Sequence, residues 1–254
     1  MLMNTFVHVE GIGIKTERHL WRQGILTWND FLSNFQQINL AYHLKKEAYE
    51  VIKRSLDAFQ TYNLRYLSQI IPRSELWRCY QEFKDNVAFV DIETDGSRGE
   101  QAITLIGIYN GVEYKYFLRN SNLLEAQNEL SQYPLIITYN GKGFDLPLIH
   151  DLFIYLHQNY IHIDIMYPLR MLGYKGGLKK IERQLNIKRT EETQYLNGWD
   201  AVRLWKEYSK EGIKKSLELL IKYNSEDCMN LKPLMEFVYS ELKAQVFERY
   251  RKYK

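Results

Sequence analysis

Residues 87–96 read VAFVDIETDG, a stretch that joins an apolar strand to a pair of carboxylates. Residues 87–90 are apolar and rich in β-branched and aromatic side chains, which is typical of a strand covered on both faces. Because side chains alternate along a strand, Asp91 and Glu93 face the same side. Neighbouring carboxylates repel unless protons or cations compensate them. The stretch therefore indicates either a cation site or a solvated strand end leading into the Asp95-Gly96 turn.

The composition sets broad limits on the class of protein. The chain has 254 residues, 45% hydrophobic and 26% charged, with a net charge of +3, which is too mild either to establish or to oppose a nucleic-acid partner. Apolar runs are too short to cross a bilayer, so no membrane is expected. The amino terminus lacks the pattern of a secretory signal, and Cys79 and Cys228 form neither a disulfide framework nor a metal knuckle. We expect a soluble cytoplasmic protein.

The pattern of the chain changes between residues 75 and 86. Residues 15–71 have helical periodicity, which Pro72 interrupts, whereas strand and helix patterns mix after residue 87. We expect a helical region over residues 1–80 and an α/β domain over residues 81–254, with a mixed sheet flanked by helices. Its expected strands contain VAFVDIE, AITLIGIYN, VEYKYFLR and PLIITYN, a helix contains NLLEAQNELSQ, and a short strand covers residues 160–165.

A further acid follows the apolar strand in residues 135–149, LIITYNGKGFDLPLI. Residues 140–143 form an expected turn, and Asp145 begins an expected helix. A third acid thus follows the end of an expected strand. The alternative is a simple helix cap ahead of Pro147.

The last acid belongs to the segment KYNSEDCMNL, which has a helical pattern. Tyr223 and Asp227 are four residues apart and so lie on one face of that helix. A tyrosine at the edge of the core beside a capping acid is the alternative, because this pair alone is a weak pattern.

The three acidic segments, around Asp91-Ile92-Glu93, Asp145 and Tyr223 to Asp227, follow one another along the chain as in the DEDD superfamily of 3′-to-5′ exonucleases. They resemble the tyrosine form of that superfamily, which has a ribonuclease-H-like fold. Within that superfamily, the sequence of about residues 86–240 is similar to that of the YprB-like branch. The resemblance rests on DIET, TYNGKGFDLPLI, His162-Ile163-Asp164, GGLKKIERQLNI, Asn197-Gly198 and YNSEDCMNL.

The resemblance implies a metal-dependent exonuclease that cleaves DNA or RNA from a single-stranded 3′ end. Two divalent cations, Mg²⁺ or Mn²⁺, would be held by Asp91, Glu93, Asp145 and Asp227, because such ions prefer oxygen ligands. Asp91 would bridge the ions, Glu93 and Asp227 would serve the nucleophile side, and Asp145 the other side. Tyr223 would orient the attacking water. A structure-selective endonuclease of the same fold and a catalytically silent nucleic-acid-binding protein are the alternatives.

Other residues around these motifs are candidate nucleic-acid contacts. His162 and Asp164 suggest a substrate or supporting contact, or else a buried structural pair. Asn140 and Lys142 lie where a phosphate could pass, although a glycine-flanked lysine is also an ordinary turn residue. A basic stretch could follow the phosphate backbone or be solvated helix charge; it contains Lys179, Lys180, Arg183, Lys188 and Arg189.

The amino-terminal segment resembles a helix-hairpin-helix element. Gly11-Ile12-Gly13 precedes an expected helix from Thr16 to Gln23, and a second helix is expected from Thr27. Glycines of such a hairpin let backbone N–H groups approach phosphate, so Gly11 and Gly13 are candidate contacts. The alternative is a helical cap whose aromatic residues, Trp21, Trp28 and Phe31, contact the catalytic domain.

Overall fold

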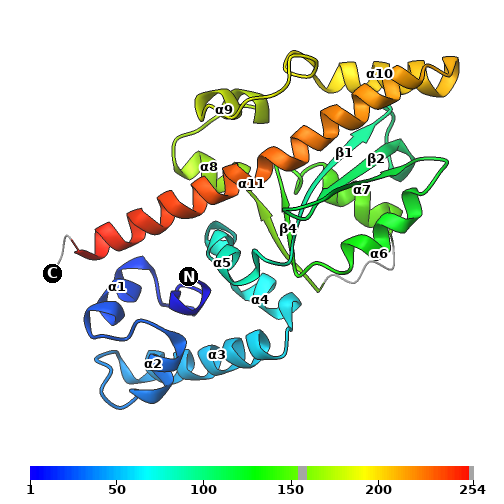
Figure 1. The fold of residues 1–254 in the computed structure, drawn as a ribbon. Helices are drawn as coiled ribbons and strands as arrows, with labels where there is room; N and C mark the ends of the chain where they lie inside the picture. Colours follow the sequence, from blue (N-terminus) through cyan, green and yellow to red (C-terminus); the bar gives the residue numbers. More distant parts are fainter. Residues whose placement is uncertain (154–158, 252–254) are drawn as a thin grey trace. The chain divides into compact units, whose positions relative to one another are not determined.

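The computed structural model describes residues 1–153 and 159–251. These residues form two compact units (Figure 1). Unit 1 contains the described residues of 1–84, 159–161 and 239–251, and unit 2 those of 85–153 and 162–238. Within the part of the chain that the structure describes, no helix is long and apolar enough to span a membrane.

Unit 1 is helical, as the periodicity before Pro72 predicts. Its helix α1 begins at Ile14, two residues earlier than expected, and α2 begins at Trp28 because Thr27 caps it through a capping box with Asp30. The elements are η1 (Leu2–Asn4), α1 (Ile14–Arg22), α2 (Trp28–Ser33), α3 (Tyr42–Gln60), α4 (Leu64–Ile70), η2 (Arg73–Cys79) and α5 (Tyr80–Phe83), where η denotes a 3₁₀ helix.

A buried carboxylate organises the amino-terminal part of unit 1. Glu17 on α1 is 1% exposed. It accepts hydrogen bonds from Thr5 Oγ1 at 3.0 Å and from the Phe6 N–H at 2.8 Å, and it pairs with Arg78 at 3.1 Å. A buried charge requires such compensation. The chain before α1 is thus fastened to η2.

Unit 2 contains a five-stranded sheet in the order β3-β2-β1-β4-β5. Strand β1 pairs antiparallel with β2 and parallel with β4, and β2 pairs antiparallel with β3. The elements are β1 (Val87–Thr94), η3 (Glu100–Ala102), β2 (Ile103–Tyr109), β3 (Tyr114–Leu118), η4 (Leu123–Glu125), α6 (Ala126–Leu130), β4 (Leu135–Thr138), α7 (Asp145–Leu152), β5 (Ile161–Asp164), α8 (Met166–Met171), α9 (Leu178–Gln184), α10 (Gly198–Glu211) and α11 (Lys214–Arg251). The expected mixed sheet with flanking helices is confirmed.

Strand β1 lies at the centre of the sheet, and its two halves have different neighbours. The apolar half pairs with β4 from Val87↔Leu135 to Phe89↔Ile137, whereas the pairing with β2 continues to Thr94. Strand β4 ends at Thr138. The acidic half of β1 therefore extends beyond its parallel partner, and the side chain of Asp145 approaches it there.

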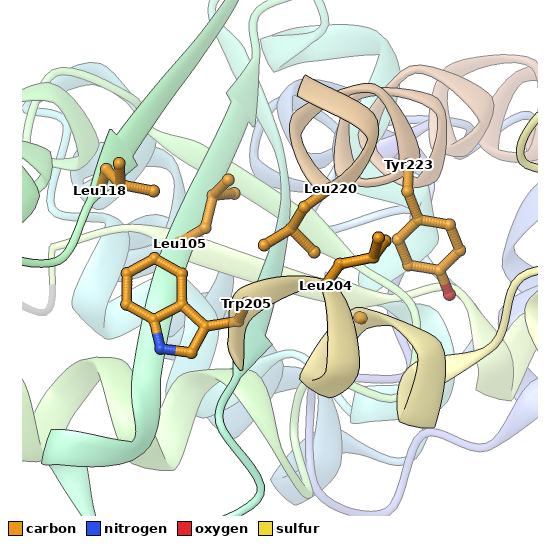
Figure 2. Close-up of a cluster of buried hydrophobic side chains, with 7 residues drawn as sticks. Leu105, Leu118, Leu204, Trp205, Leu220 and Tyr223 are labelled. Carbon is orange, nitrogen blue, oxygen red and sulfur yellow. The ribbon is translucent and has the colours of Figure 1, made fainter. Parts of the chain in front are cut away.

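Helices α10 and α11 pack on the sheet of unit 2. Buried residues of the two helices join Leu105 of β2 and Leu118 of β3 in one hydrophobic cluster (Figure 2). Trp205 comes from α10, and Leu220 and Tyr223 come from α11. Burial of these large apolar side chains fixes the amino-terminal half of α11, which carries Asp227, against the sheet.

Candidate metal centre

Three carboxylates from distant parts of the sequence converge in unit 2. Ligand oxygens of Asp91, Glu93 and Asp227 all lie within 4.8 Å of one another. Strand β1 contributes the first two, on the same side because they are two residues apart, and α11 contributes Asp227. Glu93 and Asp227 are each 6% exposed. A solvated strand end does not describe this arrangement.

Asp145 approaches the same strand from α7. It is the first residue of that helix, whose N-cap is Phe144, and no side-chain hydrogen bond caps the helix. Instead, Asp145 Oδ1 accepts a hydrogen bond from the Ile92 N–H at 3.2 Å. Asp145 is thus the first helical residue and not the N-cap, and its buried carboxylate faces β1, between the positions of Asp91 and Glu93.

The electrostatics of the cluster show that its negative charge is only partly compensated. Burial, and next the negative charge of Asp227, raise the pKa of both Asp91 and Glu93 well above their usual range. Burial also raises the pKa of Asp145 to about 7 and raises that of Asp227, although Arg189 acts in the opposite direction on Asp227. Carboxylates in this state favour protons or cations beside them. Their oxygen donors suit hard divalent ions such as Mg²⁺ and Mn²⁺, so the residues present fit a metal centre.

Asn224 joins the helix and the strand that carry these acids. Its Nδ2 donates to Asp91 Oδ2 at 2.9 Å and to Glu93 Oε1 at 3.4 Å, and its Oδ1 accepts from the Tyr114 hydroxyl at 2.8 Å. Gly107 on β2 makes room for it, because a Cβ there would lie 1.8 Å from Asn224 Oδ1. The amide therefore orients two of the acids.

A buried arginine contacts the cluster from the chain after α9. Arg189 forms ion pairs with Asp227 and, at 2.6 Å, with Glu182, and both side chains of the second pair are almost fully buried. Asn230 Nδ2 also donates to Glu182, at 2.9 Å. Arg189 therefore belongs to the acidic site, whereas its neighbours in the basic stretch, Arg183 and Lys188, are exposed.

Tyr223 lies one turn before Asp227 on α11. Its ring is 7% exposed and forms one end of the hydrophobic cluster, and its hydroxyl points away from the strand leucines (Figure 2). Lys179 Nζ lies 4.3 Å from the ring centroid. Burial and the nearby acids, Asp227 first, raise the pKa of the Tyr223 hydroxyl. The phenol is therefore protonated at neutral pH.

Four of the candidate nucleic-acid contacts lie around the turn that follows β4. Asp164 accepts hydrogen bonds from the backbone N–H groups of Asn140 at 2.8 Å, Lys142 at 3.2 Å and Met166 at 3.1 Å. Asn140 has a left-handed φ of 62°. His162 Nε2 lies 2.9 Å from Thr138 Oγ1, and burial lowers the pKa of His162 to about 3. Asp164 thus has a structural role, while Asn140 and Lys142 are exposed and stay predicted contacts.

The Gly11-Ile12-Gly13 turn belongs to unit 1. Gly11 has a φ of +79°, Gly13 caps α1, and Ile12 between them is buried. The aromatic residues of this region pack inside unit 1, where Phe31 contacts Phe6 and Trp28 contacts His8. Phosphate binding by Gly11 and Gly13 stays a prediction.

Asn224, Arg189 and Glu182 were not recognised as site residues from the sequence. Gly107 carried a usable signal for the first, because an isolated glycine inside a strand indicates close approach by another segment. Its partner Asn224 is the residue after Tyr223 in the segment KYNSEDCMNL. Nothing in the basic stretch distinguished Arg189, since burial depends on packing that the local sequence does not encode.

Comparisons with known proteins identify the family. No curated protein sequence matches the chain. Among solved structures, the chain is similar to the family B DNA polymerase from the hyperthermophilic archaeon Pyrobaculum calidifontis, with 14% identity and a TM-score of 0.47. That match covers 60% of this chain and 24% of the polymerase, about a quarter of its length. A family model described as RNase_H superfamily matches residues 88–239, more than half of the chain. The chain therefore belongs to the RNase H superfamily.

Proposed function

We propose that this protein is a metal-dependent 3′-to-5′ exonuclease of the DEDD type, in its tyrosine form, that hydrolyses phosphodiester bonds of DNA or RNA. The observation that carries the proposal is the convergence of Asp91, Glu93 and Asp227 within 4.8 Å in a buried site. Asp145 faces the same strand, and Tyr223 stands one turn before Asp227. Substrate would be a single-stranded 3′ end.

The chain's own residues have distinct tasks in this proposal. Asp91, Glu93, Asp145 and Asp227 would hold two divalent cations, Mg²⁺ or Mn²⁺. Such cations lower the pKa of water and offset the charge that develops on a phosphodiester during in-line displacement. Asn224 orients the carboxylates of Asp91 and Glu93 by donating to both.

Tyr223 suits the positioning of water better than proton abstraction. Because its pKa is raised above the ordinary value of 10, the hydroxyl keeps its proton at neutral pH. A protonated phenol both donates and accepts hydrogen bonds, so it can orient an attacking water. The burial of its ring in the hydrophobic cluster keeps that hydroxyl in one place.

The polarity of digestion tests the proposed activity. Purified protein with Mn²⁺ is incubated with end-labelled DNA and RNA strands that are linear, blocked at the 3′ end, blocked at the 5′ end, or circular. We expect stepwise products from free 3′ ends, no digestion of 3′-blocked or circular strands, and unchanged digestion of 5′-blocked strands. Cutting of circles would replace this proposal by the endonuclease. Binding without cleavage in any metal would replace it by the silent binding protein.

Location and the role of unit 1 stay predictions. Cys79 and Cys228 are both buried and free, which is compatible with the expected cytoplasm. Contact of Gly11 and Gly13 with backbone phosphates would increase the salt dependence of substrate binding.

A further inference from the structure

Arg189 is the buried cation of the acidic site and is held more firmly than an ordinary surface arginine. Its side chain is 4% exposed. Its Nε and Nη2 donate to the two oxygens of Glu182, both at 2.6 Å, in the bidentate geometry that suits a guanidinium. Glu182 is itself 1% exposed and is also fixed by Asn230. The position of the guanidinium is therefore set from outside the acidic cluster.

The same guanidinium reaches into the cluster. Its Nη2 also donates to Asp227 Oδ1, whereas its buried Nη1 has no hydrogen-bond partner among the residues that the structure describes. One oxygen of Asp227 is thus already engaged. The charge of an arginine does not titrate away in the neutral range, so any cation that binds Asp227 meets a permanent positive charge beside it.

We propose that Arg189 is a positioning residue that fixes the carboxylate of Asp227 and holds down the affinity of the metal centre for divalent cations. This inference rests on the proposed metal-dependent function. Contact with Arg189 fixes the carboxylate orientation that catalysis uses. Its charge also neutralises part of the cluster in the metal-free protein and competes with cations there. A purely structural ion pair with Glu182 would produce neither effect.

The test compares substitutions that separate charge from position. Arg189→Gln removes the charge, and Arg189→Lys keeps it but loses the bidentate geometry. Lys206→Gln, at an exposed position of α10, is the matched control, because it causes the same change of net charge away from the acidic site and the basic stretch. Binding of Mn²⁺ to the substrate-free protein is measured by titration calorimetry, and kcat and KM are measured at saturating Mn²⁺.

Opposite changes in metal affinity and turnover are the expected signature. Arg189→Gln should bind Mn²⁺ about tenfold more tightly, the scale on which one neighbouring charge changes the proton affinity of a carboxylate. Its kcat should fall while KM changes little. Arg189→Lys should keep the wild-type Mn²⁺ affinity yet lose turnover, and Lys206→Gln should match the wild type. Unchanged or weaker Mn²⁺ binding in folded Arg189→Gln protein would overturn the proposal.

A second variant applies if Arg189→Gln does not fold. Glu182→Gln removes the anionic anchor, so the charge of Arg189 acts more fully on Asp227 and Mn²⁺ binding should weaken. Tighter or unchanged binding overturns the inference. Wild-type protein that binds Mn²⁺ but cleaves no strand overturns the nuclease proposal alone, since the affinities still decide the role of Arg189. Absence of Mn²⁺ binding in the wild type overturns both.

Discussion

The amide nitrogen of Asn224 lies 2.9 Å from Asp91 Oδ2 and donates a hydrogen bond to it. This bond joins α11, the helix of Asp227, to β1, the strand of Asp91. On its other side, Asn224 Oδ1 accepts from the Tyr114 hydroxyl of β3 at 2.8 Å. One buried side chain therefore connects α11 and β1, two of the elements that form the acidic site, and fixes their spacing.

Replacement of Asn224 by alanine should damage both stability and activity. Asn224→Ala leaves the Tyr114 hydroxyl and two carboxylates without this partner, which should cost about 1–3 kcal/mol of unfolding free energy. Urea denaturation followed by circular dichroism measures it. Asn128→Ala, on the exposed surface of α6, is the control and should stay within about 0.5 kcal/mol of the wild type. Equal stability of the two variants would contradict the role given to Asn224.

Substitution at Gly107 should reveal the close approach of β2 and α11. An alanine Cβ would lie 1.8 Å from Asn224 Oδ1 and 2.9 Å from Cys228 Sγ. Gly107→Ala should therefore destabilise the protein by about 1–3 kcal/mol. In the double variant with Asn224→Ala the nearest clash is gone, so the combined effect should be smaller than the sum. Gly198→Ala is the matched control and should not destabilise the protein by a clash, because nothing lies within 4 Å of an added Cβ there. If the destabilisation of the Gly107→Ala, Asn224→Ala double variant equalled the sum of the two single variants, the packing described here would be contradicted.

Stability of the metal-free protein should fall as pH rises through the acidic range. The pKa of Asp145 is raised to about 7 by burial, against about 3.9 in an unfolded chain. The native state therefore holds more protons than the unfolded state between these values, and its stability decreases with rising pH across that window. Melting temperatures in EDTA from pH 4.5 to 8 measure the effect.

Asp145→Asn and Mn²⁺ provide the controls for this pH dependence. The variant retains an oxygen that can accept from Ile92 but has no titrating carboxyl, so its melting temperature should fall less over the same range. Saturating Mn²⁺ should reverse the slope in the wild type, because cations bind the deprotonated acids. If the melting temperature of the wild type in EDTA rose with pH, the charged acids would not be destabilising the folded protein, and the prediction would be contradicted.

Loss of the Tyr223 hydroxyl should affect turnover and not metal binding. Tyr223→Phe preserves the ring in the hydrophobic cluster and removes one hydrogen bond, so kcat should fall by about 10²-fold. Mn²⁺ affinity should match that of the wild type. Tyr116→Phe makes the same change on a residue that is 43% exposed, and it should have no effect. Loss of Mn²⁺ binding in Tyr223→Phe would mean that the hydroxyl supports the metal centre directly.

The sheet was predictable because its strands have strong local signals. Residues 87–90 are uniformly apolar, and the expected strand over residues 160–165 is observed as β5 over Ile161–Asp164. The convergence of Asp91 and Glu93 also followed from alternation along one strand. These features depend on residues that are neighbours in the sequence, so the sequence alone predicts them.

The remainder of the site depends on contacts between distant segments. Glu182 and Arg189 look like members of a solvated basic stretch, yet packing against α11 buries both. Asp164 is of a residue type that can bind metal or substrate, but its carboxylate oxygens accept hydrogen bonds from the backbone N–H groups of Asn140 and Lys142. Only the folded chain distinguishes a buried charge that serves the site from one that holds a turn.

The cleavage rate of Asp91→Asn protein tests the central claim most directly. The measurement is Mn²⁺-dependent hydrolysis of an end-labelled strand, with Asp95→Asn as the control, because Asp95 follows on the same segment but pairs with Arg119 outside the cluster. We predict that folded Asp91→Asn protein loses at least about 10²-fold in rate, while Asp95→Asn remains within a few-fold of the wild type. An Asp91→Asn variant that cleaves at the wild-type rate would contradict the assignment of this acidic cluster as the catalytic centre.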